Sequence, residues 1–305
     1  MLLRLGTRGS ALARWQAEWV AAQLRQHGVD VELLPIVTSG DRRQEVFEAG
    51  EGQGLFTKEI QLALLDDRID LAVHSFKDLP TATVAGLSVA AVPPRATTSD
   101  VLICRGDATL ATLSAGAVVG TGSVRRRAQL LHVRSDLQMK DIRGNVDSRL
   151  RKLREGHYDA IVLAEAGLRR LGLDQEINEV LPPVVMLPAA GQGALALEIR
   201  ADDEATRRCV TLLDDPSSHR AVLAERAALA ALQGGCTAPV AVLAIIDRGR
   251  LHLTCRVISE DGREMLEERA DDTLDRAERL GRDVAGKLLE RGADRLIAAA
   301  RNSPS

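Results

Sequence analysis

The chain alternates short apolar runs with amphipathic stretches from its N-terminus to residue 213. Residues 11–28 illustrate the helical pattern, because Leu12, Trp15 and Trp19 recur at helical spacing before Gly28 ends the stretch. Apolar runs such as 70–75 and 159–164 are too short for helices and predict buried strands. Strands that alternate with amphipathic helices are typical of parallel βαβ units.

The pattern predicts an α/β fold in which two such sets are joined by a linker at residues 93–100. The segment 187–200 is expected to return as a strand, and helical stretches follow at 202–213 and 217–232. Residues 239–305 differ, since three consecutive runs predict an antiparallel meander and long helices close the chain. The sequence therefore predicts two α/β domains and a smaller α+β domain with a three-stranded antiparallel sheet.

The composition is that of a globular protein, with 45% hydrophobic, 27% charged and only 2% aromatic residues. So few aromatic side chains argue against a base-stacking surface for single-stranded nucleic acid. The net charge is −3, yet residues 121–154 hold ten Lys and Arg against three Asp. Such a basic segment suits a polyanionic ligand, although solvated helix faces would have the same composition.

Nothing in the sequence indicates export or a membrane span. Arg4 and Arg8 interrupt the apolar run at the N-terminus, which therefore does not resemble a signal peptide. No uncharged stretch approaches the length of a membrane-spanning helix. The four cysteines form no CxxC pair, so we expect a cytoplasmic protein with reduced thiols.

The segment AVHSFKDLPT, residues 72–81, places polar side chains at the end of an apolar strand. Asp78 could donate a proton there, stabilise a developing cation and take a proton back. It could also merely cap the turn before Pro80. Lys77 could form a Schiff base, but a neighbouring carboxylate keeps a lysine protonated and disfavours this chemistry.

The segment GTGSVRRRAQL, residues 120–130, indicates an anion site at a helix N-terminus. Its glycines allow close backbone approach, its hydroxyls can donate hydrogen bonds, and two arginines stand in the first helical turn, where the helix dipole disfavours cations. Solvated surface arginines are the alternative interpretation. The residues concerned are Gly120, Thr121, Gly122, Ser123, Arg125 and Arg126.

Similar strand-to-helix junctions occur at two other places. Arg143 and Arg149 repeat the basic arrangement one unit later, and Arg8 stands with Ser10 at the first junction of the chain. The planar fork of arginine pairs with carboxylate or phosphate through two hydrogen bonds. Ser10 could also be a simple N-cap of the following helix, and both roles can hold.

Cys236 lies in the glycine-rich segment LQGGCTAPV, residues 232–240. No histidine stands near it in sequence to act as a base, and no second cysteine stands at metal-ligand spacing. The glycines and Pro239 favour an accessible thiol that could anchor a prosthetic group. A buried, inert thiol is the ordinary alternative, and it is expected for the other cysteines, Cys104, Cys209 and Cys255.

These segments, taken in order, resemble the porphobilinogen deaminase (hydroxymethylbilane synthase) family over nearly the whole chain. The family implies a transferase that joins four porphobilinogen molecules head to tail and releases ammonia at each step. Hydrolysis then releases 1-hydroxymethylbilane for tetrapyrrole and haem biosynthesis. The segments that carry the resemblance are GTRGSALARWQ, GLFTKE, AVHSFKDLP, GTGSVRRR, IRGNVDSRL, LPAAGQGAL and LQGGCTAPV.

The resemblance also implies a covalent dipyrromethane cofactor, one per chain, bound through a thioether to Cys236, and no metal. Asp78 matches the catalytic acid, which would assist loss of the amino group, stabilise the positive azafulvene and accept the pyrrole proton. The positions that match cofactor contacts are Ser75, Lys77, Thr121, Ser123, Arg125, Arg126 and Gly144. Those that match contacts to substrate carboxylates are Arg8, Ser10, Arg143, Arg149, Arg170 and Gln192.

Three positions depart from the family pattern. Gln53 stands where lysine is common, Gly122 where serine is common, and Phe76 where an aliphatic residue or methionine is usual. We expect these departures to affect loop contacts and turnover rate rather than the reaction.

The resemblance further implies two domains of the periplasmic-binding type, joined by a two-segment hinge, and a third that carries the cysteine. Their expected bounds are 1–95 plus 194–213, then 98–190, then 216–305, with the hinge at 93–100 and 187–193. A monomer with no nucleic-acid or membrane partner is expected. The rival interpretations are a non-enzymatic anion-binding protein, a nucleic-acid binder and a lysine-dependent aldehyde enzyme.

Overall fold

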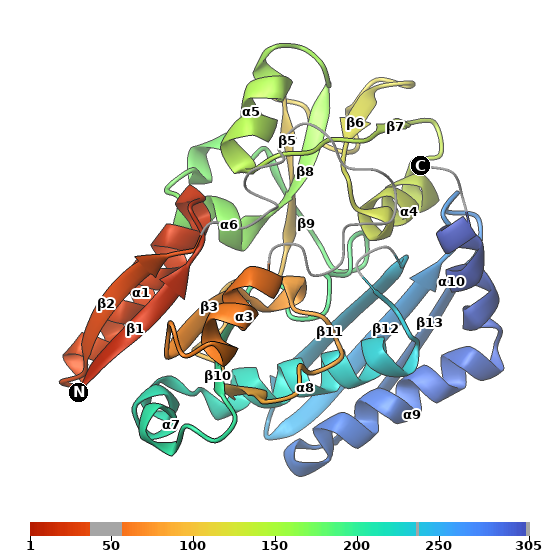
Figure 1. Cartoon of the computed structure of the whole chain (residues 1–305). Coiled ribbons are helices and arrows are strands. Elements are labelled where there is room, and N and C mark those ends of the chain that lie inside the picture. Colours follow the sequence, from red (N-terminus) through yellow and green to blue (C-terminus); the bar gives the residue numbers. More distant parts are fainter. Residues whose placement is uncertain (37–56, 236–237, 303–305) are drawn as a thin grey trace. The chain divides into compact units, whose positions relative to one another are not determined.

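The computed structural model describes residues 1–36, 57–235 and 238–302. Figure 1 labels the helices and strands, which contacts divide into two units. Unit 1 comprises residues 1–96 and 194–220, and unit 2 comprises residues 97–193 and 221–305. The chain thus passes between the units more than once, and two of these crossings fall at the hinge segments expected from the sequence.

Unit 1 is built on a five-stranded sheet in which one strand is antiparallel to its neighbours. β1 is parallel to β2 and β3, whereas β10 is antiparallel to β3 and β4, so the predicted return strand is confirmed. Across the sheet the order is β2 (Asp30–Pro35), β1 (Leu2–Thr7), β3 (Leu71–Ser75), β10 (Leu195–Arg200) and β4 (Leu87–Ala91).

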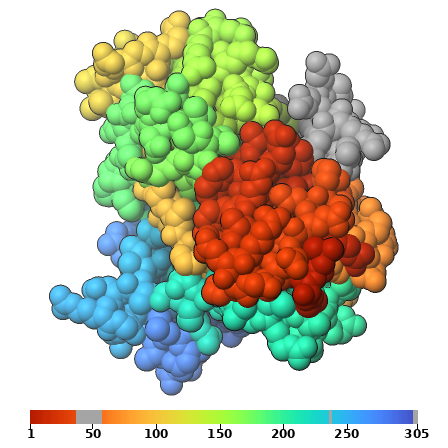
Figure 2. Space-filling view, turned by 90° about the vertical axis from the view of Figure 1, so that its left-hand side faces the viewer, coloured from red at the N-terminus to blue at the C-terminus, as the bar shows by residue number. Residues whose placement is uncertain are grey.

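Helices cover both faces of this sheet. Alternate residues of β3 point to opposite faces, and each set packs against a different helix. Leu71 and Val73 pack in the same apolar cluster as helix α1 (Ala11–Gln26), while Ala72 packs with helix α3 (Lys58–Leu65). Burying a leucine such as Leu71 contributes roughly 1.5–3 kcal/mol. In the space-filling view the residues from β1 to β2 form one continuous red surface (Figure 2).

Helix α1 starts and stops where the sequence predicts. At the start of α1 the Ser10 hydroxyl accepts a hydrogen bond from the Ala13 amide, and Gly28, with φ of +77°, follows the helix end. Helix α7 (Glu204–Val210) follows β10, and a 3₁₀ turn at Thr211–Leu213 leads to helix α8 (Pro216–Ala231).

Unit 2 contains a second five-stranded sheet with the same topology as the first. Here β6 is parallel to β7 and β8, and β5 is antiparallel to β8 and β9. Across the sheet the order is β7 (Gln138–Lys140), β6 (Val118–Gly120), β8 (Ala160–Ala164), β5 (Asp100–Cys104) and β9 (Glu179–Leu181). Its helices are α4 (Val124–Val133), α5 (Val146–Arg154) and α6 (Glu165–Arg170), with a 3₁₀ turn at Asp174–Glu176.

The rest of unit 2 is an antiparallel three-stranded sheet, as predicted, in the order of the chain. Arg248 and Gly249 form the first hairpin turn with φ of +47° and +75°, the backbone of a two-residue turn that matches strand twist. The elements are β11 (Val240–Asp247), β12 (Arg250–Ile258), β13 (Met265–Thr273), a 3₁₀ turn at Leu274–Arg276, α9 (Ala277–Glu290) and α10 (Ala293–Asn302).

The predicted fold class, α/β with a C-terminal α+β part that holds a three-stranded antiparallel sheet, is confirmed. The strand β9 was not expected, because its three residues at a sheet edge carry no clear periodicity. Within unit 2, Arg256 of β12 donates to the Gln129 side chain of α4 at 2.8 Å, and the His132 ring bonds the Gly262 carbonyl at 2.7 Å. Such contacts group the C-terminal sheet with residues 97–193, and the division into three domains stays a prediction.

In the part of the chain that the structure describes, no helix has both the length and the apolar character needed to cross a membrane.

The two glycines of α9 give a matched test of packing. A Cβ at Gly281 would lie 2.8 Å from both Ala227 Cβ and Ala228 N of α8 and closer still to the Ala224 carbonyl, whereas a Cβ at Gly286 would meet nothing within 4 Å. We expect Gly281→Ala to lower the free energy of unfolding by about 1–3 kcal/mol through overpacking. Gly286→Ala should raise it by up to about 1 kcal/mol through helix propensity. Chemical denaturation measures both, and equal effects would contradict the packing described.

Candidate functional site

In unit 1 the predicted polar residues follow two adjacent parallel strands. β1 and β3 are hydrogen-bonded neighbours, so Arg8 and Ser10, which follow β1, emerge at the same sheet edge as Ser75, where β3 ends. The buried Gln16 of α1 donates from Nε2 to Ser75 Oγ at 2.9 Å. The structure therefore brings these two predicted segments together, linked by a glutamine that the sequence analysis did not single out.

Asp78 is exposed at the end of a 3₁₀ turn, Phe76–Asp78, that directly continues β3. Phe76 is buried, and its amide donates to the Ala194 carbonyl at 3.0 Å. Leu79, which directly follows the turn, is also buried. Two buried apolar anchors thus hold a short turn whose carboxylate is accessible, and the aromatic ring at position 76 serves as one anchor.

The hydroxyls at the start of α4 make local hydrogen bonds. Ser123 is the N-cap of the helix, and its Oγ accepts from the Arg126 amide at 3.4 Å. The buried Thr121 accepts from the Ser123 amide at 3.2 Å through Oγ1. As for Ser10, the capping role is observed, and a ligand contact for these hydroxyls stays a prediction.

Arg125 and Arg126 are buried, with 5% and 6% of their surfaces exposed, so the interpretation as solvated surface arginines is wrong for this pair. Both bond the carboxylate of Asp100, whose exposed fraction is 0%. Arg125 Nη2 lies 2.8 Å from Asp100 Oδ2, and Arg126 Nη2 lies 2.7 Å from Oδ1. Burial lowers the pKa of Arg125 and the adjacent Arg126 acts in the same direction, while Asp100 opposes them.

These three buried side chains together carry one net positive charge. Burying a charge is costly unless it is paired, so the cluster favours a further anion. Asp100 escaped the sequence analysis because it ends a stretch that resembles a linker. Its signal was an acidic residue directly before the apolar run VLIC.

Arg143, Gly144 and Arg149 surround the start of α5. Arg149 Nε donates to the Gly144 carbonyl at 2.8 Å, and the exposed Arg143 bonds Asp141 Oδ2 at 2.9 Å. Gly144 has φ of +114°, and a Cβ there would lie 2.9 Å from Ser148 Cβ, so only glycine fits without strain. The predicted residues are therefore neighbours on one strand-to-helix junction.

Arg170 and Gln192 lie beside the segments where the chain leaves unit 2. Arg170 Nη2 donates to the Gly193 carbonyl at 2.8 Å, and burial lowers the pKa of Arg170 to about 10. Gln192, 1% exposed, donates through Nε2 to the Thr98 carbonyl at 2.6 Å and to Asp100 Oδ1 at 3.0 Å. Both side chains thus bond the protein itself, and their contacts to substrate stay predictions.

Cys236 and Gln53 lie outside the described residues. Of the other cysteines, Cys255 is buried as expected, whereas Cys104 and Cys209 are only half-buried, so the expectation of burial is wrong for these two. Burial raises the pKa of Cys255 to about 12 and that of Cys104 to about 11, which favours the unreactive thiol form. Among the residues placed by the structure, no group of His, Cys, Asp and Glu could hold a metal ion.

Polar side chains at strand ends in unit 1, and buried arginines at a helix start in unit 2, are features that α/β proteins commonly use to bind small anionic molecules. Residues 3–208 match the family model "Porphobilinogen deaminase, dipyromethane cofactor binding domain". Residues 219–290 match "Porphobilinogen deaminase, C-terminal domain". The chain therefore belongs to the porphobilinogen deaminase family, whose members are transferases.

Three curated relatives, each named porphobilinogen deaminase, match almost end to end. The protein of Moorella thermoacetica is 47% identical over 97% of this chain and 95% of its own length. That of Desulforudis audaxviator is 48% identical over 97% of each chain. That of Syntrophotalea carbinolica is 46% identical over 99% of this chain and 97% of its own.

Among solved structures, that of the methionine binding protein MetQ covers 70% of this chain and 89% of its own, with a TM-score of 0.45 and 12% identity. We infer nothing from a likeness of this size.

The described residues fit the dipyrromethane group that the family model names. Each pyrrole of that group carries an acetate and a propionate. The buried excess of positive charge at Arg125 and Arg126 suits such carboxylates, and the amides at the start of α4 can donate to them.

The raised pKa values of Cys104 and Cys255 predict slow alkylation of the native chain at pH 8, where fewer than about 1 in 100 of either thiol is ionised. Iodoacetamide labelling followed by peptide mass mapping measures this. The denatured chain is the control, because both thiols should then react quickly at the ordinary cysteine pKa of about 8.5. Rapid labelling of either native thiol would contradict the burial described.

Proposed function

We propose that the chain has hydroxymethylbilane synthase activity. It joins four porphobilinogen molecules head to tail, releases one ammonia per addition and frees 1-hydroxymethylbilane with water, in tetrapyrrole biosynthesis. The observation that carries the proposal is the buried pair Arg125 and Arg126, set at a helix start in a chain of this family. Loss of covalent pyrrole from a Cys236 variant is the experiment that tests it.

Binding in this proposal is the work of arginines, because each added pyrrole brings two carboxylates. A guanidinium stays charged at any working pH and forms two parallel hydrogen bonds with a carboxylate. Arg125 and Arg126 would hold the cofactor, with Ser75, Lys77, Thr121, Ser123 and Gly144 as further contacts. Substrate carboxylates would be bound by Arg8, Ser10, Arg143, Arg149, Arg170 and Gln192.

Asp78 would carry the proton transfers. Its carboxyl group gives a proton as the amino nitrogen of porphobilinogen leaves as ammonia, and its carboxylate then stabilises the cation left on the substrate. The same carboxylate takes the proton from the pyrrole carbon after the new bond has formed. Exposure at the end of an anchored turn supports this role, since a carboxylate must reach the substrate to exchange protons.

Cys236 would hold the dipyrromethane through a thioether. When bound, that group supplies the pyrrole carbon to which the first substrate is joined. The protein therefore needs no nucleophile of its own in each turnover, which accounts for the absence of a histidine beside Cys236 in the sequence.

We also propose three domains with a hinge at residues 93–100 and 187–193, and a monomer that acts in the cytoplasm without a nucleic-acid or membrane partner. The scarcity of aromatic residues supports the exclusion of single-stranded nucleic acid. The crossings of the chain at 96–97 and 193–194 support the choice of hinge segments.

Cys236→Ser should yield a folded chain without the mass surplus of two linked pyrroles, because an alcohol is a far weaker nucleophile than a thiolate. Intact mass spectrometry of the purified chain measures this. Cys209→Ser, which changes a partly exposed cysteine elsewhere, should keep the surplus. A full surplus on the Cys236 variant would show that the anchor lies elsewhere.

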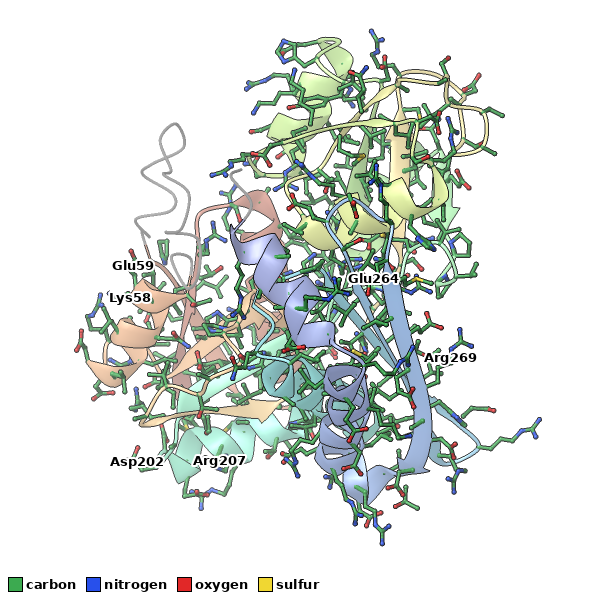
Figure 3. The ribbon with its side chains drawn as sticks, turned by 90° about the vertical axis from the view of Figure 1, so that its right-hand side faces the viewer. Lys58, Glu59, Asp202, Arg207, Glu264 and Arg269 are labelled. Atoms are coloured by element: carbon green, nitrogen blue, oxygen red, sulfur yellow. The ribbon has the colours of Figure 1, made fainter. Side chains whose placement is uncertain are left out.

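Asp78→Asn should reduce turnover about a hundredfold or more, since the amide can neither donate nor accept the proton. The free energy of unfolding should stay within about 0.5 kcal/mol, because the side chain is exposed. Asp202→Asn is the matched control, as Asp202 is an exposed aspartate of the same unit, before α7 (Figure 3). Equal rates for the two variants would remove Asp78 from the chemistry.

A further inference from the structure

Asp100 is a fully buried carboxylate that bonds both predicted cofactor arginines, Arg125 and Arg126. Its Oδ1 accepts from Arg126 Nε at 3.1 Å and from Nη2 at 2.7 Å, and its Oδ2 lies 2.8 Å from Arg125 Nη2. The remaining bonds of the two guanidiniums reach backbone carbonyls. Arg125 Nη1 donates to Leu187 at 2.6 Å, and Arg126 Nη1 donates to Val162 at 3.0 Å.

These contacts fix the orientation of both guanidinium planes. Three nitrogens of Arg126 bond protein acceptors, so the plane cannot rotate without breaking them. Arg125 is held at Nη1 and Nη2 by acceptors from different segments, Leu187 and Asp100. An arginine has five N–H donors, and each of these two side chains therefore keeps donors for a ligand while its plane is fixed.

The same carboxylate also joins two of the segments at which the chain crosses between the units. Gln192 Nε2 donates to Asp100 Oδ1 at 3.0 Å and to the carbonyls of Thr98 and Ser99 at 2.6 and 3.3 Å. A second buried carboxylate, Glu165, holds the neighbouring Thr97 hydroxyl at 2.6 Å. Glu165 pairs with the exposed Arg169 rather than with Arg125 or Arg126.

Asp100 sets the net charge that the two guanidiniums offer to a ligand. Two buried guanidiniums without an anion would repel each other in a medium of low polarity, and a fully neutralised pair would have no charge left with which to attract a carboxylate. One carboxylate beside two guanidiniums reduces their repulsion without neutralising both charges. The cluster keeps one positive charge and a set of oriented donors.

We propose that Asp100 is a positioning residue, which holds the Arg125 and Arg126 guanidiniums in the orientation that binds one cofactor carboxylate and leaves one positive charge for it. This rests on the proposed function. Asp100 acts through the arginines and does not itself contact the cofactor. Asp100 differs in this from Glu165, which holds the same boundary segment through Thr97 but does not bond Arg125 or Arg126.

The test compares Asp100→Asn with Glu165→Gln in the full-length chain. Each full-length chain is produced in cells that make no porphobilinogen, so that it is purified without the surplus, and is then incubated with porphobilinogen. Intact mass spectrometry follows the fraction that gains two linked pyrroles, below the thermal midpoint of every variant. Asp100→Asn should acquire the surplus at least tenfold more slowly than the unaltered chain, and Glu165→Gln at the unaltered rate. Normal loading of Asp100→Asn, or equal slowing of both variants, would overturn the proposal.

If Asp100→Asn fails to fold, Asp100→Glu tests whether Asp100 positions the two guanidiniums. The longer side chain keeps the negative charge but moves it relative to both guanidiniums. Slow loading by a folded Asp100→Glu chain supports positioning, and normal loading shows that charge balance alone suffices and overturns it. If the unaltered chain itself never gains the surplus, the proposed function fails, and that result is distinguishable from a failure confined to the Asp100 variants.

Discussion

The organisation of unit 2 depends on burying two guanidiniums against one carboxylate. An uncompensated buried charge destabilises a fold by several kcal/mol, so Arg125 and Arg126 can leave the solvent only because Asp100 and two backbone carbonyls receive their hydrogen bonds. The three acceptor segments come from different places in the sequence. The ion cluster therefore ties β5, β8 and the segment before Pro188 to the first turn of α4.

The two five-stranded sheets share one topology, and both place polar residues at the ends of parallel strands. In each, three parallel strands end at the same edge, and a strand of opposite direction is inserted beside them. Loops after parallel strands carry the polar residues, because backbone donors at the following helix starts lie there. The antiparallel strands β10 and β5 directly follow the crossings of the chain, so each sheet is completed by a strand next to the unit boundary.

Local signals in the sequence predicted most of this arrangement. Ser10 and Ser123 were expected at helix starts, and each accepts the capping hydrogen bond from the third residue beyond it. Capping is a matter of neighbouring residues, and a single sequence contains all the information it needs. The three-stranded meander could also be predicted from the sequence, because the alternation of its residues and its Arg248–Gly249 turn are local features.

Partners distant in sequence could not be predicted in this way. The pairing of Asp100 with Arg126 spans 26 positions, and that of Gln192 with Asp100 spans 92, so neither leaves a periodic trace. The buried contact of Gln61 with Glu198 spans 137 positions and is of the same kind. Arginines that face a ligand and arginines that face a buried carboxylate look alike in a sequence. Only coordinates show that Arg125 and Arg126 have a resident partner.

Burial also separates two kinds of arginine in unit 2. Arg125 and Arg126 are almost fully buried, whereas Arg143 is exposed and pairs with an exposed aspartate, Asp141. A guanidinium in an apolar surrounding binds an anion strongly but exchanges it slowly, since each exchange exposes a poorly solvated charge. An exposed guanidinium binds weakly and exchanges quickly, because water and ions screen it. The first kind of arginine suits a carboxylate that stays bound, and the second suits a carboxylate that is exchanged.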